Sequence, residues 1–523
     1  MWRSRFLNLF LHQYKVDVLE APPLPHFAVT SQPTPTHNLQ FSHSHTSPPP
    51  TSHGLRSSHK VDIIGSMEAL TSWASSHGAE LHPAVEVFND NDTGNSFRVR
   101  VGQQLSPGET IATCPFSLTL SYLNTLDLKA HGYESHDDAQ PLPREFVENI
   151  PPHVVARFFL MKQYLLGRDS FWYPYICTLP QPDQLSSWSL PPLWPSDDIE
   201  LLEDTNIHTV VAEIKARLKA EYKQATPLLA ALPNANDYTR LLYNWAYSIF
   251  TSRSFRPSRV VPDHESLPLP EGCAIDDFHI LMPLFDIGNH SHSAGISWDI
   301  APGTSTTVLK TLDAYESGAQ VFNNYGSKTN AELMLAYGFL IPESPTLHND
   351  FVHLQLRTAD ETASSLADSA KPRSFFFSLR PVADPSSLAA HRQLTLPNID
   401  PASVLPAFRH VQDALIWQLF LLQTTPEQRN TINVPSDAKD SDEERLKAVL
   451  TGKLPDEFTP ILEQTMAIIQ AKAMQELEKL EQSDFELDKD TNATRIQRMV
   501  YQYRTQCRQV LINVLESVEP PPE

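Results

Sequence analysis

The stretch PLFDIGNHSH, residues 283–292, places polar side chains directly behind a short apolar run. Asp286, Asn289 and His290 carry groups that are costly to bury without a hydrogen-bonding partner, and their apolar neighbours indicate burial. An Asn-His pair after an apolar strand is, by itself, more typical of a turn with a satisfied core histidine. By itself the stretch therefore does not indicate a functional site, and it has to be interpreted together with the other segments.

Three further segments have the same mixed character. They are FTSRSF at 250–255, VFNNYG at 321–326 and YGSKTNAELMLAYGF at 325–339. Tyr325 and Tyr337, twelve residues apart, would alone be ordinary aromatic core residues. All four segments lie between residues 250 and 339.

The part before these segments predicts short strands. A helix is expected around Glu68–His77, followed by strands at Val85–Phe88, Phe97–Val101 and Thr110–Pro115, separated by Asn, Asp and Gly turns. Pro107-Gly108 marks a tight turn between the second and third strands.

From Phe146 to Phe255 apolar residues recur at helical spacing, which predicts a helical insert. Short apolar segments then return at Ile280–Phe285, Thr307–Leu312 and Gln320–Asn323 and predict further strands. The pattern is β-rich, then helical, then β-rich again. This is typical of an α+β fold.

The C-terminal part changes character after about Phe351. Some strand-like sequence gives way to amphipathic patterns that predict long helices at Val404–Leu422, Phe458–Leu480 and Thr494–Leu515. We expect an all-helical C-terminal domain. The predicted division of the chain is 1–66, a leader; 67–345, with a helical insert at about 130–250; and 350–520, the helical domain.

The leader has two interpretations. Residues 1–16 carry three basic residues, a short apolar run and no acid, which suits an organelle transit peptide. The alternative, which we prefer, is a disordered leader. Residues 21–60 are rich in Pro, Ser, Thr and His, so they cannot bury enough apolar surface to offset the conformational entropy lost on folding. His43 and His45 lack further ligands nearby for a metal.

Composition excludes several classes of protein. The formal net charge is −22 and no basic stripe is present, which argues against direct binding of nucleic acid. No apolar run approaches the ~20 residues that cross a bilayer, so we expect no membrane partner. The four cysteines lie far apart without a C-x-x-C pair, which argues against a zinc cluster and predicts no metal. A reduced compartment, cytoplasmic or nuclear, fits best.

In this order the motifs resemble one family. Ser252-Arg253-Ser254-Phe255, Pro283 through His290, and Tyr325 through Phe339 are similar to the elements of SET-domain protein methyltransferases of the Rubisco large-subunit lysine methyltransferase type. That family also includes actin-histidine and ribosomal-protein lysine methyltransferases. The resemblance covers about residues 68–345. It implies a β-rich SET fold with a threaded pseudoknot, a helical insertion and a C-terminal substrate-binding domain.

Two more segments support the resemblance, and one departs from it. SFWYPYICTLP at 170–180 and LSPGETIATCPFSLTLS at 105–121 look like family elements. The family's Gly-rich turn, where backbone amides meet the cofactor, corresponds here to Gly94 through Arg98. A backbone contact tolerates a change of side chain, so this departure bears on cofactor affinity rather than on the fold.

The resemblance implies a role for each site residue. S-adenosylmethionine would be the cofactor, with Ser252, Arg253, Asp286, Asn289 and His290 on its side of the site. Tyr337 would be the catalytic tyrosine, with Tyr325 supporting it. The structural alternative is that Asn289 and His290 only hold the threaded loop and that Tyr337 only packs.

The expected activity is methylation of a lysine side chain on another protein, such as a ribosomal or other abundant cytosolic protein, by a monomeric enzyme. Lysine is preferred because it is the commoner target in the family, and histidine methylation is the alternative. Two other classes remain open: a non-catalytic SET-fold scaffold, and an interaction protein that works through an amphipathic groove of its C-terminal helices.

Overall fold

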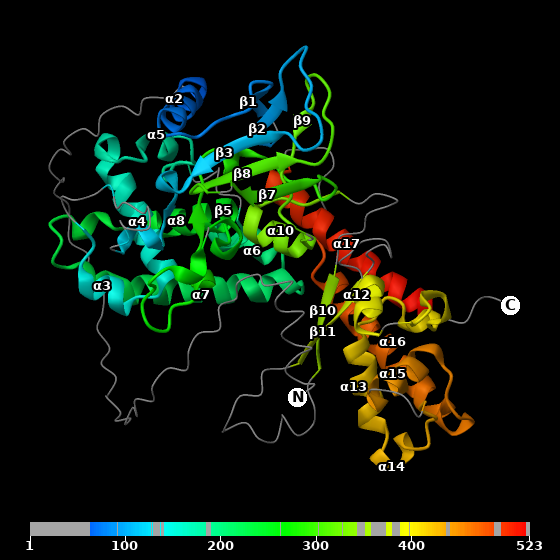
Figure 1. Cartoon of the computed structure of the whole chain (residues 1–523). Coiled ribbons are helices and arrows are strands. Elements are labelled where there is room, and N and C mark those ends of the chain that lie inside the picture. The colour runs from blue at the N-terminus through cyan, green and yellow to red at the C-terminus, as the bar shows by residue number, and fades with distance from the viewer. Residues whose placement is uncertain are drawn as a thin grey trace, which may run out of the picture. The chain divides into compact units, whose positions relative to one another are not determined.

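The structure is a computed structural model, shown in Figure 1. The residues it describes are 63–90, 93–126, 128, 136, 141–184, 190–261, 263–301, 303–326, 328–342, 351–356, 373–378, 388–396, 398–435, 440–485 and 493–518. Residues 1–62 of the predicted leader, including its histidine pair, lie outside these residues, whereas residues 63–66 already belong to a helix that begins at Ile63. The chain from Ile63 to Glu523 forms one compact unit. Its division near residue 345 therefore stays a prediction.

Helices alternate with short strands along this unit. The helices are α2 (Ile63–Ser76), α3 (Arg144–Asn149), α4 (Pro152–Leu166), α5 (Tyr173–Ile176), α6 (Ser196–Glu200), α7 (Asn206–Ala225), α8 (Arg240–Arg253), α9 (Pro257–Val260), α10 (Asn330–Tyr337), α12 (Leu388–Thr395), α13 (Asp413–Gln423), α14 (Pro426–Arg429), α15 (Ser441–Thr451), α16 (Thr459–Gln482) and α17 (Arg495–Val518). The strands are β1 (Val85–Asp90), β2 (Gly94–Val99), β3 (Thr110–Pro115), β4 (Leu120–Ser121), β5 (Ser254–Phe255), β6 (Ile280–Leu281), β7 (Ile296–Ile300), β8 (Thr306–Thr311), β9 (Gln320–Val321), β10 (Phe351–Leu356) and β11 (Arg373–Ser378).

The strands form small sheets, which confirms the α+β class. Three sheets have three strands each, in the orders β1-β2-β9, β3-β8-β7 and β4-β6-β5, and their described pairings are antiparallel. In the first sheet Phe97 pairs with Val321, which brings strands far apart in sequence together. Since Phe97 and Val321 are both 1% exposed, the pair belongs to the core.

Most strand predictions from the sequence are confirmed, and β3 has the predicted bounds. The segment Ile280–Phe285 is different, because only Ile280–Leu281 is a strand. Pro283 lacks the N–H that a further ladder bond requires. Leu284 then takes a positive φ of 74°, unusual for a residue with a Cβ, and a 3-10 turn, Phe285–Ile287, follows. This turn carries Asp286.

The helical insert packs through α4 and α8 onto the short strands (Figure 1). A buried ion pair joins its helices, because Arg157 on α4 donates to Glu221 on α7 at 2.8 Å. Arg157 also donates to the hydroxyl of Tyr243 on α8 at 3.0 Å. The position of α8 matters for function, since its last two residues are Ser252 and Arg253.

Two expectations about the C-terminal part are wrong. It is not all-helical, because it opens with the antiparallel pair β10 and β11. The helix expected over Val404–Leu422 begins only at Asp413. Pro406 starts a separate 3-10 turn, since proline cannot continue a helical hydrogen-bond ladder, and Val411 pairs with Phe377. The two long helices are α16 and α17, close to their predicted bounds.

Neither a membrane span nor a disulfide is found in the described part of the chain. No helix there is both long and apolar enough to cross a bilayer. The four cysteines are free thiols, and Cys114 and Cys507 are buried.

Candidate active site

Four separate segments carry the residues that the motifs singled out. Ser252 and Arg253 end α8, and Asp286 lies in the turn after β6. Asn289 and His290 follow that turn directly. Tyr325 comes shortly after β9, and Tyr337 is the last residue of α10. Only tertiary contacts can therefore bring these segments together.

The segment of Asn289 and His290 lies side by side with the segment before Tyr325. The N–H of Asn323 donates to the carbonyl of Asn289 at 2.8 Å, and the N–H of Ser291 donates to the carbonyl of Asn323 at 2.9 Å. A Cβ added at Gly288 would stand 3.2 Å from the Cβ of Asn323, so glycine permits this close approach. This pairing supplies the contact that the expected pseudoknot needs.

His290 is fixed against Tyr325 in two ways. Its Nδ1 accepts a hydrogen bond from the N–H of Tyr325 at 3.1 Å, and the two rings stack with centroids 5.0 Å apart. Burial, together with the smaller effects of the charges of His292 and Lys328, lowers the pKa of His290 to about 4. The ring is therefore neutral at pH 7, with its proton on Nε2, because Nδ1 is an acceptor. Nε2 is buried and has no hydrogen-bond partner.

Tyr325 and Tyr337 form a stacked pair. Their ring centroids are 4.7 Å apart with an angle of 27° between the planes. The hydroxyl of Tyr325 donates to the carbonyl of Gly288 at 3.0 Å. Burial raises the pKa of Tyr325 to about 12 and also raises that of Tyr337, so both phenols keep their protons. Gly338, at φ 74°, ends α10 directly behind Tyr337.

Asp286 and Arg253 form a partly buried pair beside the tyrosines. A guanidinium nitrogen of Arg253 donates to the backbone carbonyl of Asp286 at 3.2 Å and lies 3.5 Å from its carboxylate. The hydroxyl of Tyr175 donates to the same carboxylate at 2.9 Å. Burial raises the pKa of Asp286, while Arg253 and Tyr175 oppose that rise. The charges of Arg253 and Asp286 also act on Tyr325, so the pair and the tyrosines share one region.

Asn289 and Ser252 make different contacts. The side-chain nitrogen of Asn289 donates to the hydroxyl of Thr93 at 2.9 Å and lies 3.4 Å from the side-chain oxygen of Gln320. This places Asn289 at the corner before Gly94, where the sequence departs from the family pattern. The hydroxyl of Ser252 donates to the carbonyl of Ser248 within α8, at 2.8 Å.

Sequence reasoning missed several residues of this region. Tyr175 was noticed only as part of the segment 170–180, and neither Thr93 nor Gln320 was singled out. Their types carry no signal of their own, because a tyrosine, a threonine and a glutamine are common anywhere. Among the described residues, no group of three or more His, Cys, Asp or Glu side chains is placed to hold a metal ion.

The chain is similar in sequence to several protein methyltransferases. It is 29% identical over 306 residues to a ribosomal lysine N-methyltransferase, set10, of Schizosaccharomyces pombe, covering 56% of this chain and 50% of the relative. It is 25% identical over 277 residues to the human actin-histidine N-methyltransferase, covering 52% of this chain and 41% of the relative. The chain thus spans about half the length of these curated relatives or less. No family model matches it.

Solved structures with a similar fold are Rubisco methyltransferase structures. The SET domain of LSMT bound to lysine and AdoHcy superposes with a TM-score of 0.56 and 14% identity, covering 87% of this chain and 91% of that one. Rubisco LSMT bound to AdoMet gives a TM-score of 0.53 at 16% identity, with the same coverage. The chain therefore has the SET fold of the Rubisco large-subunit methyltransferase, and the resemblance indicated by its motifs is confirmed by both its relatives and its fold.

Proposed function

We propose that this chain is a protein methyltransferase that uses S-adenosylmethionine to methylate a lysine side chain of another protein. The observation that carries the proposal is the stacked pair of Tyr325 and Tyr337, packed against His290. Two motifs distant in sequence, Pro283 through His290 and Tyr325 through Phe339, meet in this cluster, and Arg253 of the third motif is bonded to Asp286 beside it. They are the motifs that resemble the SET methyltransferases.

The residues present fit the proposed cofactor. S-adenosylmethionine has an adenine ring rich in hydrogen-bond acceptors, a positive sulfonium and an amino-acid end with a carboxylate. The buried Nε2–H of His290 is a donor without a partner, as a site for an acceptor requires. Arg253 is 28% exposed and its guanidinium has donors beyond the one bonded to Asp286, so it suits a carboxylate. Asn289, Asp286 and Ser252 line up with the family's cofactor-side positions by resemblance.

When bound, the cofactor supplies an electrophilic methyl group for an in-line displacement by an amine. The chain has to orient that amine and exclude water. Tyr337 would orient it through its hydroxyl, which burial keeps protonated. Tyr325 would support Tyr337 from behind, since its own hydroxyl is committed to the Gly288 carbonyl.

The incoming lysine must be neutral to act as a nucleophile, and its reference pKa is ~10.4. An apolar aromatic surface disfavours the ammonium form by desolvation. The tyrosine pair offers such a surface, because both residues are half-buried and neither phenol ionises at pH 7. We therefore assign no dedicated general base.

Histidine is the second candidate target. The actin-histidine methyltransferases among the relatives support it, whereas set10 and the LSMT structures with bound lysine support lysine. An imidazole has a reference pKa of ~6.5 and is mostly neutral at pH 7, so it needs no help with deprotonation. The same tyrosine pair could serve both.

Calorimetric titration of the full chain with S-adenosylmethionine tests the proposal. We expect micromolar binding that Asn289→Ala abolishes or weakens strongly, because the substitution removes the contact with Thr93 beside the cofactor corner. The matched control is Asn149→Ala, an exposed asparagine on α3. Failure of the folded wild-type chain to bind would exclude catalysis and favour a SET-fold scaffold.

The modified residue is identified separately. Incubation of cell extract with a labelled methyl donor, followed by peptide mass spectrometry, should place the label on lysine. Label on histidine would instead establish the second candidate. If no label is transferred although the cofactor binds, partner capture by the C-terminal helices becomes the leading function, and capture by a chain cut after residue 350 would contradict that role.

A further inference from the structure

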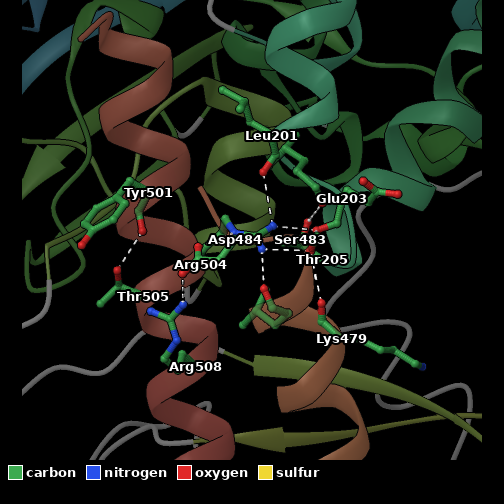
Figure 2. Close-up of polar contacts among 12 residues, drawn as sticks. Leu201, Glu203, Thr205, Lys479, Ser483, Asp484, Tyr501, Arg504, Thr505 and Arg508 are labelled. Atoms are coloured by element: carbon green, nitrogen blue, oxygen red, sulfur yellow. Dashed lines mark hydrogen bonds and ion pairs between the residues drawn. The ribbon is translucent and has the colours of Figure 1, made fainter. Parts of the chain in front are cut away.

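The C-terminal helix α17 is attached to the rest of the protein by two buried polar side chains. The first is Arg504, whose side chain is 1% exposed. Figure 2 shows its polar contacts. Arg504 donates to the carbonyls of Leu201 at 3.3 Å, Glu203 at 2.6 Å and Leu480 at 2.6 Å, and to the hydroxyl of Ser483 at 3.0 Å. These groups lie on the helical insert and at the C-terminal end of α16, so Arg504 fixes α17 to both.

The second buried side chain is Gln506, which is 4% exposed. Its side-chain oxygen accepts from the amide nitrogen of Asn330 at 3.0 Å, and its own nitrogen donates to the carbonyl of Ile341 at 3.4 Å. Asn330 is the first residue of α10 and is 0% exposed. The C-terminal helix thus reaches the helix that ends in Tyr337.

Asn330 also forms two hydrogen bonds with Ile341, beyond the other end of that helix, and we call this pair of residues the clasp. The side-chain oxygen of Asn330 accepts from the N–H of Ile341 at 2.9 Å, and its nitrogen donates to the carbonyl of Ile341 at 3.0 Å. Asn330 and Ile341 therefore bracket Tyr337 along the chain. Gln506 contacts both ends of this clasp.

The segment inside the clasp is short and rigid. α10 has eight residues and begins with a capping box between Thr329 and Glu332. Two helical turns span about 10 Å, so a displacement of the first residue passes with little loss to the last. The ring of Tyr337 is stacked on Tyr325, which is held from elsewhere through Gly288. A shift of α10 would therefore disturb that stacking.

We propose that Gln506 is a positioning residue for Tyr337, acting through the clasp of Asn330 and Ile341, so that the C-terminal helix forms part of the active-site framework. The proposal rests on the function assigned above to Tyr337. Loss of the Gln506 amide removes one buried hydrogen bond from Asn330 and one from the carbonyl of Ile341, which weakens the hold on both ends of the clasp. A change at Gln506 then acts on the reaction from outside the site.

Fluorine NMR of the full chain with 3-fluorotyrosine incorporated at position 337 tests this. Gln506→Met removes both hydrogen bonds and nearly keeps the side-chain shape. Gln509→Met makes the same exchange at an exposed position of the same helix. We expect a shifted or broadened resonance for Gln506→Met and an unchanged one for Gln509→Met. Unchanged resonances in both would overturn the proposal.

A second pair of variants guards against misfolding. If Gln506→Met does not fold, Gln506→Glu is compared with Gln509→Glu. Glutamate at 506 keeps the oxygen that accepts from Asn330 but loses the N–H that donates to Ile341. The resonance of position 337 should therefore move in Gln506→Glu and stay unchanged in Gln509→Glu. An unmoved resonance in the folded Gln506→Glu protein counts against the proposal.

Kinetics supply an independent reading. Misplacement of a reacting group by about 1 Å costs on the order of 10²-fold in rate, so kcat should fall about 10-fold or more in Gln506→Met while KM and cofactor affinity change little. A raised KM with unchanged kcat would show that Gln506 serves substrate docking and would refute positioning. The NMR comparison needs neither cofactor nor turnover, so it still decides the proposal if the chain proves not to be a methyltransferase.

Discussion

Tyr325 and Tyr337 stack ring on ring at 4.7 Å although they are held by different parts of the chain. Tyr325 is tied to Gly288 through its hydroxyl and to His290 through its backbone N–H. Tyr337 depends on α10, and through the clasp of Asn330 on the C-terminal helix. The stacking geometry therefore depends on two separate parts of the chain, and a change in either part should disturb it.

Tyr337→Phe should abolish most methyl transfer. The substitution keeps the stacked ring and removes the hydroxyl that orients the amine, so kcat should fall on the order of 10²-fold. Cofactor affinity, measured by calorimetry, should change little. Tyr501→Phe, at a half-buried tyrosine of α17, is the control with the same chemical change. Equal activity of Tyr337→Phe and wild type would show that Tyr337 only packs.

Arg253→Met should destabilise the fold because it leaves the Asp286 carboxylate, 2% exposed, without its cation. The free energy of unfolding should fall by about 3 kcal/mol, the lower end for a buried pair, since Arg253 is partly exposed. Adding Asp286→Asn should restore much of that loss, because the uncompensated charge is gone. Urea unfolding of both variants measures this. A double variant no more stable than the single one would contradict the pairing.

Acid should weaken the fold through His290. Its folded pKa, about 4, lies below the usual histidine pKa of 6.5, so the fold prefers the neutral ring. The resulting stability is fully present above pH 6.5 and is lost as the pH falls towards 4, up to about 3 kcal/mol. His290→Gln does not titrate, so its unfolding free energy should fall less than that of wild type between pH 7.5 and 4.5. Parallel losses would show that His290 is already solvated.

Glu221 should add a second loss at lower pH. Burial alone would raise its pKa, but the charge of Arg157 and the hydrogen bond with His153 lower it to about 2. A depressed carboxylate stabilises the fold above its unfolded pKa, and that stability is lost as the pH falls from 4.5 to about 2. Glu221→Gln should therefore be less stable than wild type at pH 7, with a flatter acid limb in urea unfolding. The exposed Glu145→Gln on α3 is its control.

Several local features could be predicted from the sequence. The bounds of β3 were predicted directly, and those of α16 and α17 within about three residues, because alternation and helical periodicity act over near neighbours. The motif segments stood out because polar groups lay among apolar ones, and the resemblance to a family then implied a role for each residue. The helix over Val404–Leu422 was wrong at its start, since the break at Pro406 outweighs the apolar spacing.

The sequence by itself determined the α+β class, the strands and the long helices, because these follow from side-chain chemistry and short-range periodicity, and its resemblance to a family indicated which residues to propose for function. The tertiary structure decided which of them meet. It placed Thr93 beside Asn289, Tyr175 on Asp286, and Gln506 on Asn330, a residue 176 positions earlier in the chain. Such contacts depend on how whole elements pack, and no local pattern encodes which buried amide will find which partner.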